Sequence, residues 1–329
     1  MPGHTFRRLQ KSAAWAAAAV TLCLFLGPCR ALPPAAGAAV QEKVILDTDI
    51  ADDIDDAYAL ALVASAPDMK LLGVTTTFGE TGKRAQVAAK LLAALGRRDV
   101  PVYAGRKGAR AIGRQYDWAR GFRSPAFRSG EAALFMKAQI DRAPGQITLI
   151  GIGPLVNMGD LLTLYPEVKP KIRCIVLMGG AVHTGYNGQA PAGPEWNIYC
   201  DPAAARVIFT SGVPLVMAGL EVTTMLHLDA ERQKRLFASG TPGTDALAAL
   251  TSLWGGGTPT LFDVAAVAYA MGHRFCDEER DRVVVDDNGL TRITGGAPNV
   301  TVLVHPHPDL FLDWYVSTLR TQIPGDKAP

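Results

Sequence analysis

Six aspartates stand within ten residues near the start of the chain, directly after a short apolar run at residues 44–46. Carboxylates this close together repel one another unless a cation lies among them, and Ca²⁺ and Mg²⁺ are cations that prefer carboxylate oxygens. The apolar run predicts a buried strand, and in an open α/β sheet ligands bind at the carboxyl ends of the strands. A solvated loop whose acids cap a helix is the alternative, but it does not explain why the acids follow directly on a buried strand. We therefore predict a metal site in the acidic segment, residues 47–56, whose acids are Asp47, Asp49, Asp52, Asp53, Asp55 and Asp56.

Apolar runs alternate with helical patterns from about residue 42 onward, which predicts an α/β protein. We expect one open, mainly parallel sheet flanked by helices, in a single domain that spans residues 40–329. The segment 106–130 is polar and aperiodic, which is typical of a functional loop. The expected strands are 44–46, 70–77, 100–103, 147–152, 173–178 and 213–218, with a hairpin of 282–286 and 300–304; the expected helices are 85–95, 230–238 and 308–319, and the helical pattern loosens after 238 toward the glycines at 255–257.

Residues 1–39 differ from the rest of the chain and predict an export signal peptide. Arg7 and Arg8 precede an apolar run at residues 12–26, and small residues at 36–38 form a plausible cleavage site. The competing interpretation is a transmembrane anchor, but the run is short for a span of roughly 20 residues. We therefore expect an exported protein, periplasmic or secreted, that is not held at a membrane after the signal is removed.

The charge of the chain gives no indication of nucleic acid binding. The sequence holds 33 Lys and Arg against 31 Asp and Glu. Four of the basic residues and none of the acids lie in residues 1–39, so a chain starting near Val40 carries 29 − 31 = −2. No block of basic residues follows. A small-molecule partner is therefore expected rather than a nucleic acid.

Nine short segments, in the same order along the chain, resemble those of the nucleoside hydrolases. These are calcium-dependent enzymes that cleave the N-glycosidic bond of ribonucleosides to ribose and free base. The resemblance extends from about Lys43 to the C-terminal helix and implies the Rossmann-like fold of that family, Ca²⁺ as cofactor and a ribonucleoside as substrate; we also expect a homo-oligomer, a dimer or a tetramer. The segments are ILDTDIADDIDDAYAL (45–60), VTTTFGET (74–81), DVPVYAG (99–105), IGPLVNMG (152–159), IVLMGGAV (175–182), PEWNIYCDPAAA (194–205), GLEVT (219–223), FDVAAVAYAM (262–271) and GLTR (289–292).

The resemblance implies four calcium ligands. They are the carboxylates of Asp49, Asp56 and Asp263 and the main-chain carbonyl of Val156, where the family's usual residue is threonine. A bound Ca²⁺ orients and acidifies a water molecule, and Asp49 could also take its proton as general base. Asp47 is expected to brace the segment from behind the ligands.

The resemblance also implies the residues that contact the substrate. Asp55 matches the acid that hydrogen-bonds the ribose, and Glu195 and Asn197 match residues that hold the sugar's hydroxyls. Two positions depart from the family's common pattern: Glu80 stands where asparagine is usual, and Phe262 stands where many members carry a histidine that is proposed to protonate the leaving base. The preferred base does not follow from these residues.

The acidic segment is two residues longer than the family's common form, DxDPGxDDA. We align Asp55 and Asp56 with the family's last two acids because the residues after them continue as the family does. Asp52 and Asp53 are then additional acids, either loop caps or a second layer around the ion.

Breaking a ribosyl C–N bond develops positive charge on the sugar, and clustered carboxylates stabilise that charge. With phenylalanine at position 262, the leaving base must be activated in another way. Stacking on an aromatic ring is one possibility and another histidine is a second; the candidates are Tyr116, Trp118, Trp196 and Trp254 for stacking, and His183, His227 and His273 as acids.

Two other functions compete with this interpretation. A Mg²⁺-dependent phosphatase of the haloacid-dehalogenase kind also uses a strand that ends in D-x-D, with Asp47 as nucleophile, but it leaves the segments 194–197 and 262–271 without a role. A non-catalytic exported protein that binds nucleosides or sugars is consistent with the changes at Glu80 and Phe262. The complete set of acids argues against it.

Overall fold

The computed structural model describes residues 41–128 and 131–323. The export signal predicted at residues 1–39 lies outside the described residues. In the described part of the chain, no helix combines the length and the apolar composition that a membrane-spanning segment needs.

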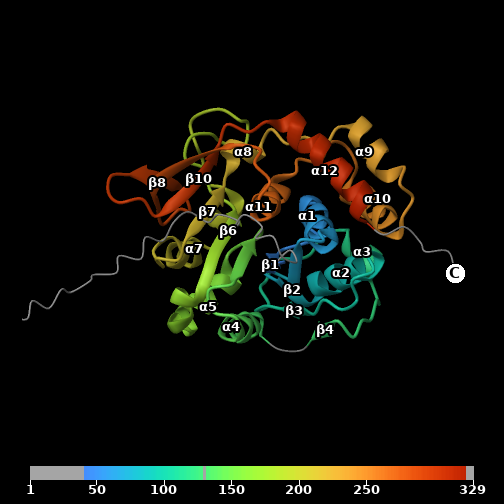
Figure 1. Ribbon diagram of the computed structural model, residues 1–329, viewed down its shortest axis with the longest axis horizontal. Helices are drawn as coiled ribbons and strands as arrows, with labels where there is room; N and C mark the ends of the chain where they lie inside the picture. Colours follow the sequence, from blue (N-terminus) through green and yellow to red (C-terminus); the bar gives the residue numbers. More distant parts are fainter. Residues whose placement is uncertain (1–40, 129–130, 324–329) are drawn as a thin grey trace, which may run out of the picture.

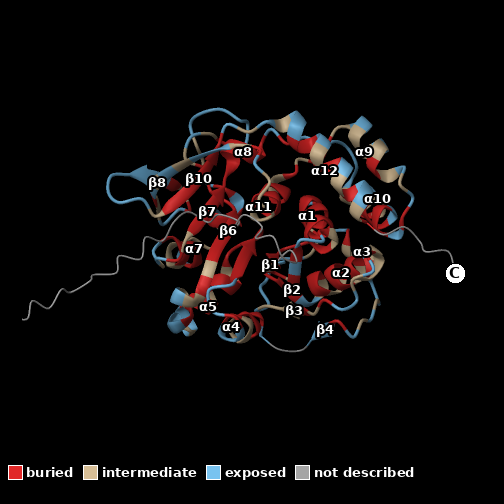
Figure 2. Ribbon diagram, in the orientation of Figure 1, coloured by how far each residue is buried: buried red, intermediate tan, exposed pale blue. Residues whose placement is uncertain are grey.

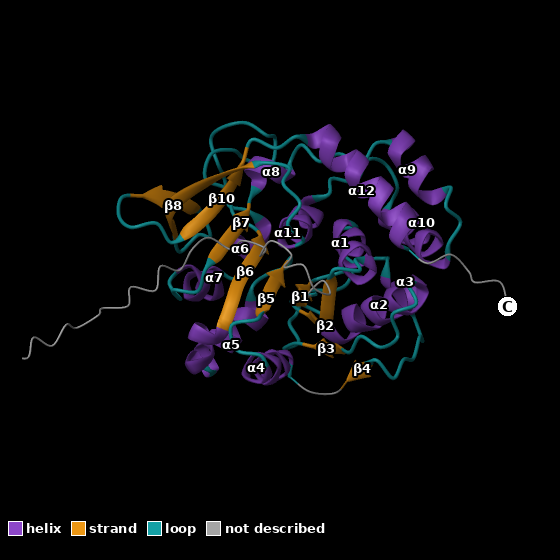
Figure 3. Ribbon diagram, viewed as in Figure 1, coloured by secondary structure: helices purple, strands orange, loops and turns teal. Residues whose placement is uncertain are grey.

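The strands of the described residues form one ten-stranded sheet in the order β4-β3-β2-β1-β5-β6-β7-β10-β8-β9 (Figure 3). Neighbouring strands are parallel except at β8, which is antiparallel to both β10 and β9. The chain proceeds from β1 to β2 on one side and later returns to β5 on the other, so the strand order reverses between β1 and β5. Ligands of open α/β sheets bind at such a switch point. The strands are β1 (Glu42–Thr48), β2 (Met69–Thr76), β3 (Val102–Ala104), β4 (Phe127–Arg128), β5 (Ile147–Gly151), β6 (Ile172–Met178), β7 (Leu215–Ala218), β8 (Asp277–Val285), β9 (Thr291–Thr294) and β10 (Val300–Val304).

Helices cover both faces of the sheet (Figure 1). Alternate residues of a strand point to opposite faces: Val44 and Leu46 of β1 belong to the core beneath α1, α2, α10, α11 and α12, whereas Ile45 belongs to the core beneath α4, α5 and α7. Strands buried on both faces are continuous apolar runs, which explains why the sequence located them. The helices are α1 (Asp55–Ser65), α2 (Thr81–Ala94), α3 (Tyr116–Ala119), α4 (Ala132–Arg142), α5 (Val156–Leu164), the 3₁₀ helix η1 (Pro166–Lys171), α6 (Trp196–Cys200), α7 (Pro202–Phe209), α8 (Leu220–Thr223), α9 (Ala230–Phe237), α10 (Pro242–Trp254), α11 (Phe262–Ala270) and α12 (Pro308–Gln322).

Helix α1 lies inside the protein rather than on its surface, and almost all of its residues are buried (Figure 2). It packs against α11, α12, α2 and α10. The Tyr58 hydroxyl lies 2.8 Å from the Thr251 hydroxyl of α10, and the Tyr315 hydroxyl of α12 donates to the Tyr58 carbonyl at 3.1 Å. These contacts fix the N-terminus of α1, which carries Asp55 and Asp56.

The predicted fold class is confirmed, and the expected strands before the hairpin agree with β1, β2, β3, β5, β6 and β7 to within one or two residues, whereas β4 and β9 were not predicted. The loosening of the helical pattern expected after residue 238 is wrong for residues 242–254, which form α10. Helix α10 begins there because Thr241 and Thr244 form a capping box and Pro242 occupies the first helical position. The expected pairing of 282–286 with 300–304 is wrong: β10 pairs with residues 277–281 of β8, and residues 282–285 pair with β9 instead.

Two helical glycines give a matched test of this packing. A Cβ atom added at Gly159 in α5 would lie 2.7 Å from the Ala204 Cβ of α7, whereas one added at Gly82 in α2 meets nothing within 4 Å. Overpacking costs about 1–3 kcal/mol and exceeds the gain of up to about 1 kcal/mol for alanine over glycine in a helix. We expect Gly159→Ala to lower the unfolding temperature and Gly82→Ala to raise it slightly, measured by calorimetry. Shifts in the same direction would contradict the close approach of α5 to α7.

Candidate active site

A pocket of about 470 Å³ opens at the carboxyl ends of the central strands. Asp49 follows β1, Ile152 follows β5 and Met178 ends β6, and all three line the pocket. The volume is suitable for a small ligand. Seven carboxylates also line it: Asp49, Asp52, Asp53, Asp55, Asp56, Asp263 and Glu195.

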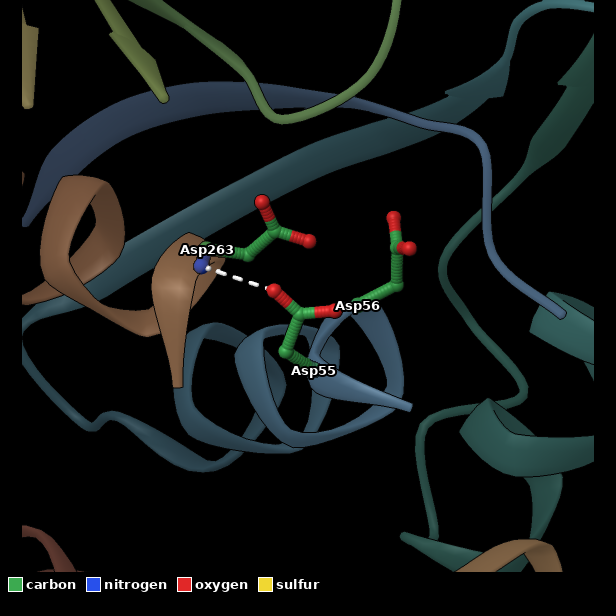
Figure 4. Close-up of side chains that lie close together, drawn as sticks. All are labelled: Asp55, Asp56 and Asp263. Carbon is green, nitrogen blue, oxygen red and sulfur yellow. Dashed lines mark hydrogen bonds between the residues drawn. The ribbon is translucent and has the colours of Figure 1, made fainter. Parts of the chain in front are cut away.

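Three of these acids converge from two helix N-termini (Figure 4). Carboxylate oxygens of Asp55 and Asp56 on α1 and of Asp263 on α11 lie within 4.8 Å of one another. The Asp263 backbone N–H donates to Asp55 at 3.2 Å, and all three residues are buried. Burial raises each pKa well above its ordinary range, and the neighbouring carboxylates raise it further. A buried set of oxygen donors that repel one another fits a hard divalent cation such as Ca²⁺.

Asp49 lies beside this cluster. It is buried against the pocket, and burial raises its pKa to about 7. Its carboxylate needs a glycine at position 153, where an added Cβ would lie 2.6 Å from the Asp49 Oδ1. The cluster thus contains two of the predicted ligands, Asp56 and Asp263, together with Asp55, and the predicted ligand Asp49 lies next to it. Val156 begins α5 and is not among the residues that line the pocket, so its carbonyl stays a predicted ligand.

Asp47 lies behind the pocket rather than in its lining. It accepts hydrogen bonds from the Thr75 hydroxyl at 2.6 Å and from the Asn157 amide at 2.7 Å. Burial raises the pKa of Asp47 to about 7. This placement fits a bracing role and not the exposed nucleophile that a phosphatase of the haloacid-dehalogenase kind requires.

Glu195 and Asn197 enter the pocket from α6. Glu195 caps this helix and accepts hydrogen bonds from the backbone N–H groups of Asn197 at 3.0 Å, Ile198 at 3.2 Å and Gly180 at 2.9 Å. The Asn197 side-chain amide donates to the Met178 carbonyl at 3.1 Å. Both side chains are buried and held in place before any ligand binds.

Of the two positions that depart from the family pattern, Phe262 lines the pocket and Glu80 does not. Phe262 begins α11, lines the pocket and packs edge-on against Tyr186, with ring centroids 6.1 Å apart. Glu80 is not among the residues that line the pocket. Its carboxylate lies 3.2 Å from the ammonium groups of both Lys83 and Lys107, and hydrogen bonds to these lysines lower its pKa. These ion pairs direct Glu80 away from the substrate contact that the sequence predicts for it.

The sequence prediction missed Arg84, whose guanidinium is fully buried beneath the acidic segment. It donates to the carbonyls of Phe78 at 2.7 Å, Ile50 at 2.9 Å and Asp49, and to the Asp52 carboxylate at 2.8 Å. The available signal was its place in α2, where it falls on the same buried stripe as the apolar residues around it. Arg84 fixes the main chain and leaves the Asp49 carboxylate facing the pocket.

The two additional acids connect the acidic segment to residues 106–128. Asp52 accepts a hydrogen bond from the Gly113 N–H at 3.0 Å, and the buried Gln115 amide donates to the Asp53 carbonyl at 2.7 Å. Asp53 also accepts from the Ile54 N–H at 2.6 Å. Both acids thus act as loop caps, and the docked segment brings Arg110 into the pocket lining.

Aromatic side chains complete the pocket. Of the predicted stacking candidates, Trp196 and Trp254 line it, whereas Tyr116 and Trp118 do not. None of the three histidines that we considered as acids lines it either. The sequence prediction missed Tyr186, Tyr199 and Arg110 in the lining, because all three lie outside regular strands or on the short helix α6.

The fold and the pocket define an α/β protein with a small-ligand site at the switch point of its sheet. The family model of the inosine-uridine preferring nucleoside hydrolases matches residues 44–313. The pyrimidine-specific ribonucleoside hydrolase RihA of Shewanella oneidensis is 32% identical over 315 residues, 85% of this chain and 97% of that protein. The RihA of Citrobacter koseri is 30% identical over 291 residues, 79% and 92% of the two chains.

Solved structures agree with these relatives. The purine-preferring ribonucleoside hydrolase from Gardnerella vaginalis superposes with a TM-score of 0.74 at 25% identity, over 85% of this chain and 99% of that one. The chain therefore belongs to the inosine-uridine preferring nucleoside hydrolase family and is a hydrolase that acts on N-glycosyl compounds. The resemblance found in the sequence is confirmed, and the phosphatase alternative is excluded.

Removing the guanidinium of Arg84 tests its role in holding the acidic segment. We expect Arg84→Met to lower the free energy of unfolding by about 3–5 kcal/mol, because it leaves buried carbonyls and Asp52 without their donor. Arg292→Met is the matched control, since Arg292 is an exposed arginine paired with Asp286 and should contribute little. Urea unfolding of both variants measures the difference. Equal effects would show that the buried guanidinium is not needed.

Proposed function

We propose that this enzyme hydrolyses the N-glycosidic bond of ribonucleosides to ribose and free base in a calcium-dependent reaction. The observation that carries this proposal is the buried cluster of Asp55, Asp56 and Asp263 in one pocket with Glu195 and Asn197. The relatives are named for pyrimidine and for purine ribonucleosides. The proposal therefore covers ribonucleosides as a class.

The residues of the pocket divide the chemistry between them. Asp55, Glu195 and Asn197 hold the ribose hydroxyls, which places the anomeric carbon over the acids. Asp49 takes the proton of the attacking water as general base, since its carboxylate lines the pocket beside the clustered acids. The surrounding carboxylates stabilise the positive charge that develops on the sugar.

Asp56 and Asp263 of the buried cluster would hold the Ca²⁺, together with Asp49 and the Val156 carbonyl that the resemblance adds, while Asp55 beside them binds the ribose. When bound, the ion supplies coordination sites for a water molecule and for sugar hydroxyls. It also offsets the mutual repulsion of the clustered acids, whose pKa values are raised first by burial and further by that repulsion.

We further propose that the enzyme acts outside the cytoplasm, as a homo-oligomer. The predicted signal peptide at residues 1–39 supports export. Fractionation of cells that express the full chain, followed by N-terminal sequencing of the product, tests the export.

Chelation separates the proposed enzyme from a protein that only binds nucleosides. We expect dialysed protein to release reducing sugar from uridine, cytidine or inosine, to lose this activity in excess chelator and to regain it with Ca²⁺. Calcium should also raise the unfolding temperature, because a ligand at 100 times its Kd contributes about 2.7 kcal/mol of stability. Full activity in excess chelator would rule out the metal, and binding of nucleosides without sugar release would favour the non-catalytic alternative.

The alignment of the acidic segment can be tested on the metal itself. Asp56→Ala removes one carboxylate of the buried cluster, and we expect calcium affinity to fall at least about 100-fold. Asp53→Ala removes a loop cap outside the cluster and should leave calcium affinity close to that of the wild type. Titration calorimetry measures both. The reverse ranking of the two variants would show that Asp53 is the true ligand.

A further inference from the structure

The pocket holds one cationic side chain and no imidazole. Among residues 41–128 and 131–323, neither histidine nor lysine lines it, and Arg110 is the only arginine that does. Phe262 lines the pocket at the position where the resemblance implies a histidine that protonates the leaving base, and phenylalanine cannot donate a proton. Any positive charge that the protein itself brings to the departing base must therefore come from Arg110.

Arg110 is held at the pocket wall by two neighbours. Its guanidinium carbon lies 4.9 Å from the centre of the Trp196 ring, which also lines the pocket. Its Nε lies 3.7 Å from the Asp52 carboxylate on the other side. The backbone of Arg110 packs closely on Gly79, where φ is +69° and an added Cβ would lie 2.5 Å from the Arg110 carbonyl. The guanidinium is thus oriented while about half of the Arg110 side chain stays exposed.

The donors of Arg110 are available to a ligand. Asp52 already accepts a hydrogen bond from Arg84 at 2.8 Å, and 3.7 Å to Arg110 is beyond hydrogen-bond length. The Arg110 guanidinium makes no hydrogen bond to any of the described residues, whereas the Arg84 guanidinium donates several. Its planar fork of N–H groups therefore remains unused beside the cavity.

The position of the sugar determines where the base must lie. Under the proposed function, the ribose is held by the buried acids and by Glu195 and Asn197, so the base extends toward the open side of the pocket. The half-exposed aromatic rings of Tyr186, Trp196 and Tyr199 lie on that side. Because Arg110 contacts Trp196, the guanidinium is on the side of the pocket that receives the base.

We propose that Arg110 is a catalytic residue that stabilises the departing base as an anion, in place of a proton donor. The inference rests on the proposed function. The C1′–N bond breaks and its electron pair leaves with the base, whose charge spreads onto ring and carbonyl acceptors that the guanidinium hydrogen-bonds. The water oxygen forms the new bond to C1′ and its proton goes to Asp49. The released base then takes a proton from solvent.

An alternative role for Arg110 would be to bind the phosphate group of an anionic substrate, and the charge of the pocket argues against this role. One guanidinium faces seven carboxylates in the lining, so a nucleoside phosphate would meet a strongly negative site. An arginine cannot itself give up a proton, because its pKa exceeds 12. Its contribution is that of a preformed donor to a developing negative charge, and removing one such donor typically lowers kcat by about 10²–10³.

The test compares two leaving groups in the full-length enzyme with calcium. The leaving group of uridine is uracil, which is the less stable anion. The leaving group of p-nitrophenyl riboside is p-nitrophenolate, which is a stable anion. We expect Arg110→Met to lower kcat on uridine about 10²–10³-fold and to lower kcat on the nitrophenyl riboside far less. Arg110→Lys should recover part of the loss, since it restores the charge without the fork. Arg106→Met is the control, because Arg106 belongs to the same segment and pairs with Asp160 at the surface.

Unfolding temperature and calcium affinity are measured for each variant and should match those of the wild type. Equal losses of kcat on both substrates, or a change in KM alone, would overturn the role of Arg110 in leaving-group departure. A loss confined to a 5′-phosphorylated substrate would assign Arg110 to substrate binding instead. If the wild type cleaves neither riboside, the proposed function itself is wrong, and the inference fails with it.

Discussion

The arrangement of this site depends on one buried cation, the guanidinium of Arg84. A buried charge is unfavourable unless it is paired and hydrogen-bonded, and Arg84 satisfies this condition with main-chain carbonyls and the Asp52 carboxylate. By bonding the carbonyls of Asp49 and Ile50, it fixes the path of the chain without using the Asp49 side chain. The acids that face the pocket are therefore held close together despite their repulsion, and they remain free to bind a cation.

The topology of the sheet adds a second constraint. The acidic segment leaves β1 where the strand order reverses, and the buried helix α1 starts directly after it. Helix α11 begins at the same place and presents Asp263, so two helix N-termini point at one cluster (Figure 4). The positive end of each helix dipole favours negative charge there. The inner part of the pocket is consequently buried and acidic, whereas its outer part consists of half-exposed aromatic rings and Arg110.

The sequence predicted those parts of the fold and site that are encoded locally. Strands buried on both faces are apolar runs, and Asp56, Asp263, Glu195, Asn197 and Phe262 were located because short motifs carry them into the pocket. Contacts between distant segments were not predictable in this way. The partners of Arg84 and the ion pairs that withdraw Glu80 depend on the paths of loops, which no periodic pattern specifies. The helix α10 was missed although Thr241 and Pro242 mark its start, because the glycines after Trp254 were given more weight.

The additional acid Asp52 lies at the centre of several contacts between the acidic segment and residues 106–128. The lengthened acidic segment supplies Asp52, which bonds Arg84, accepts the Gly113 N–H and lies beside Arg110. The same contacts dock residues 106–128 at the pocket, in the space next to Gly79, while Glu80 turns outward to its lysines. A phenylalanine at position 262 removes an imidazole, and the docked segment brings in a guanidinium. The Asp52 carboxylate thus links the acidic segment to the residues that bring Arg110 into the pocket lining.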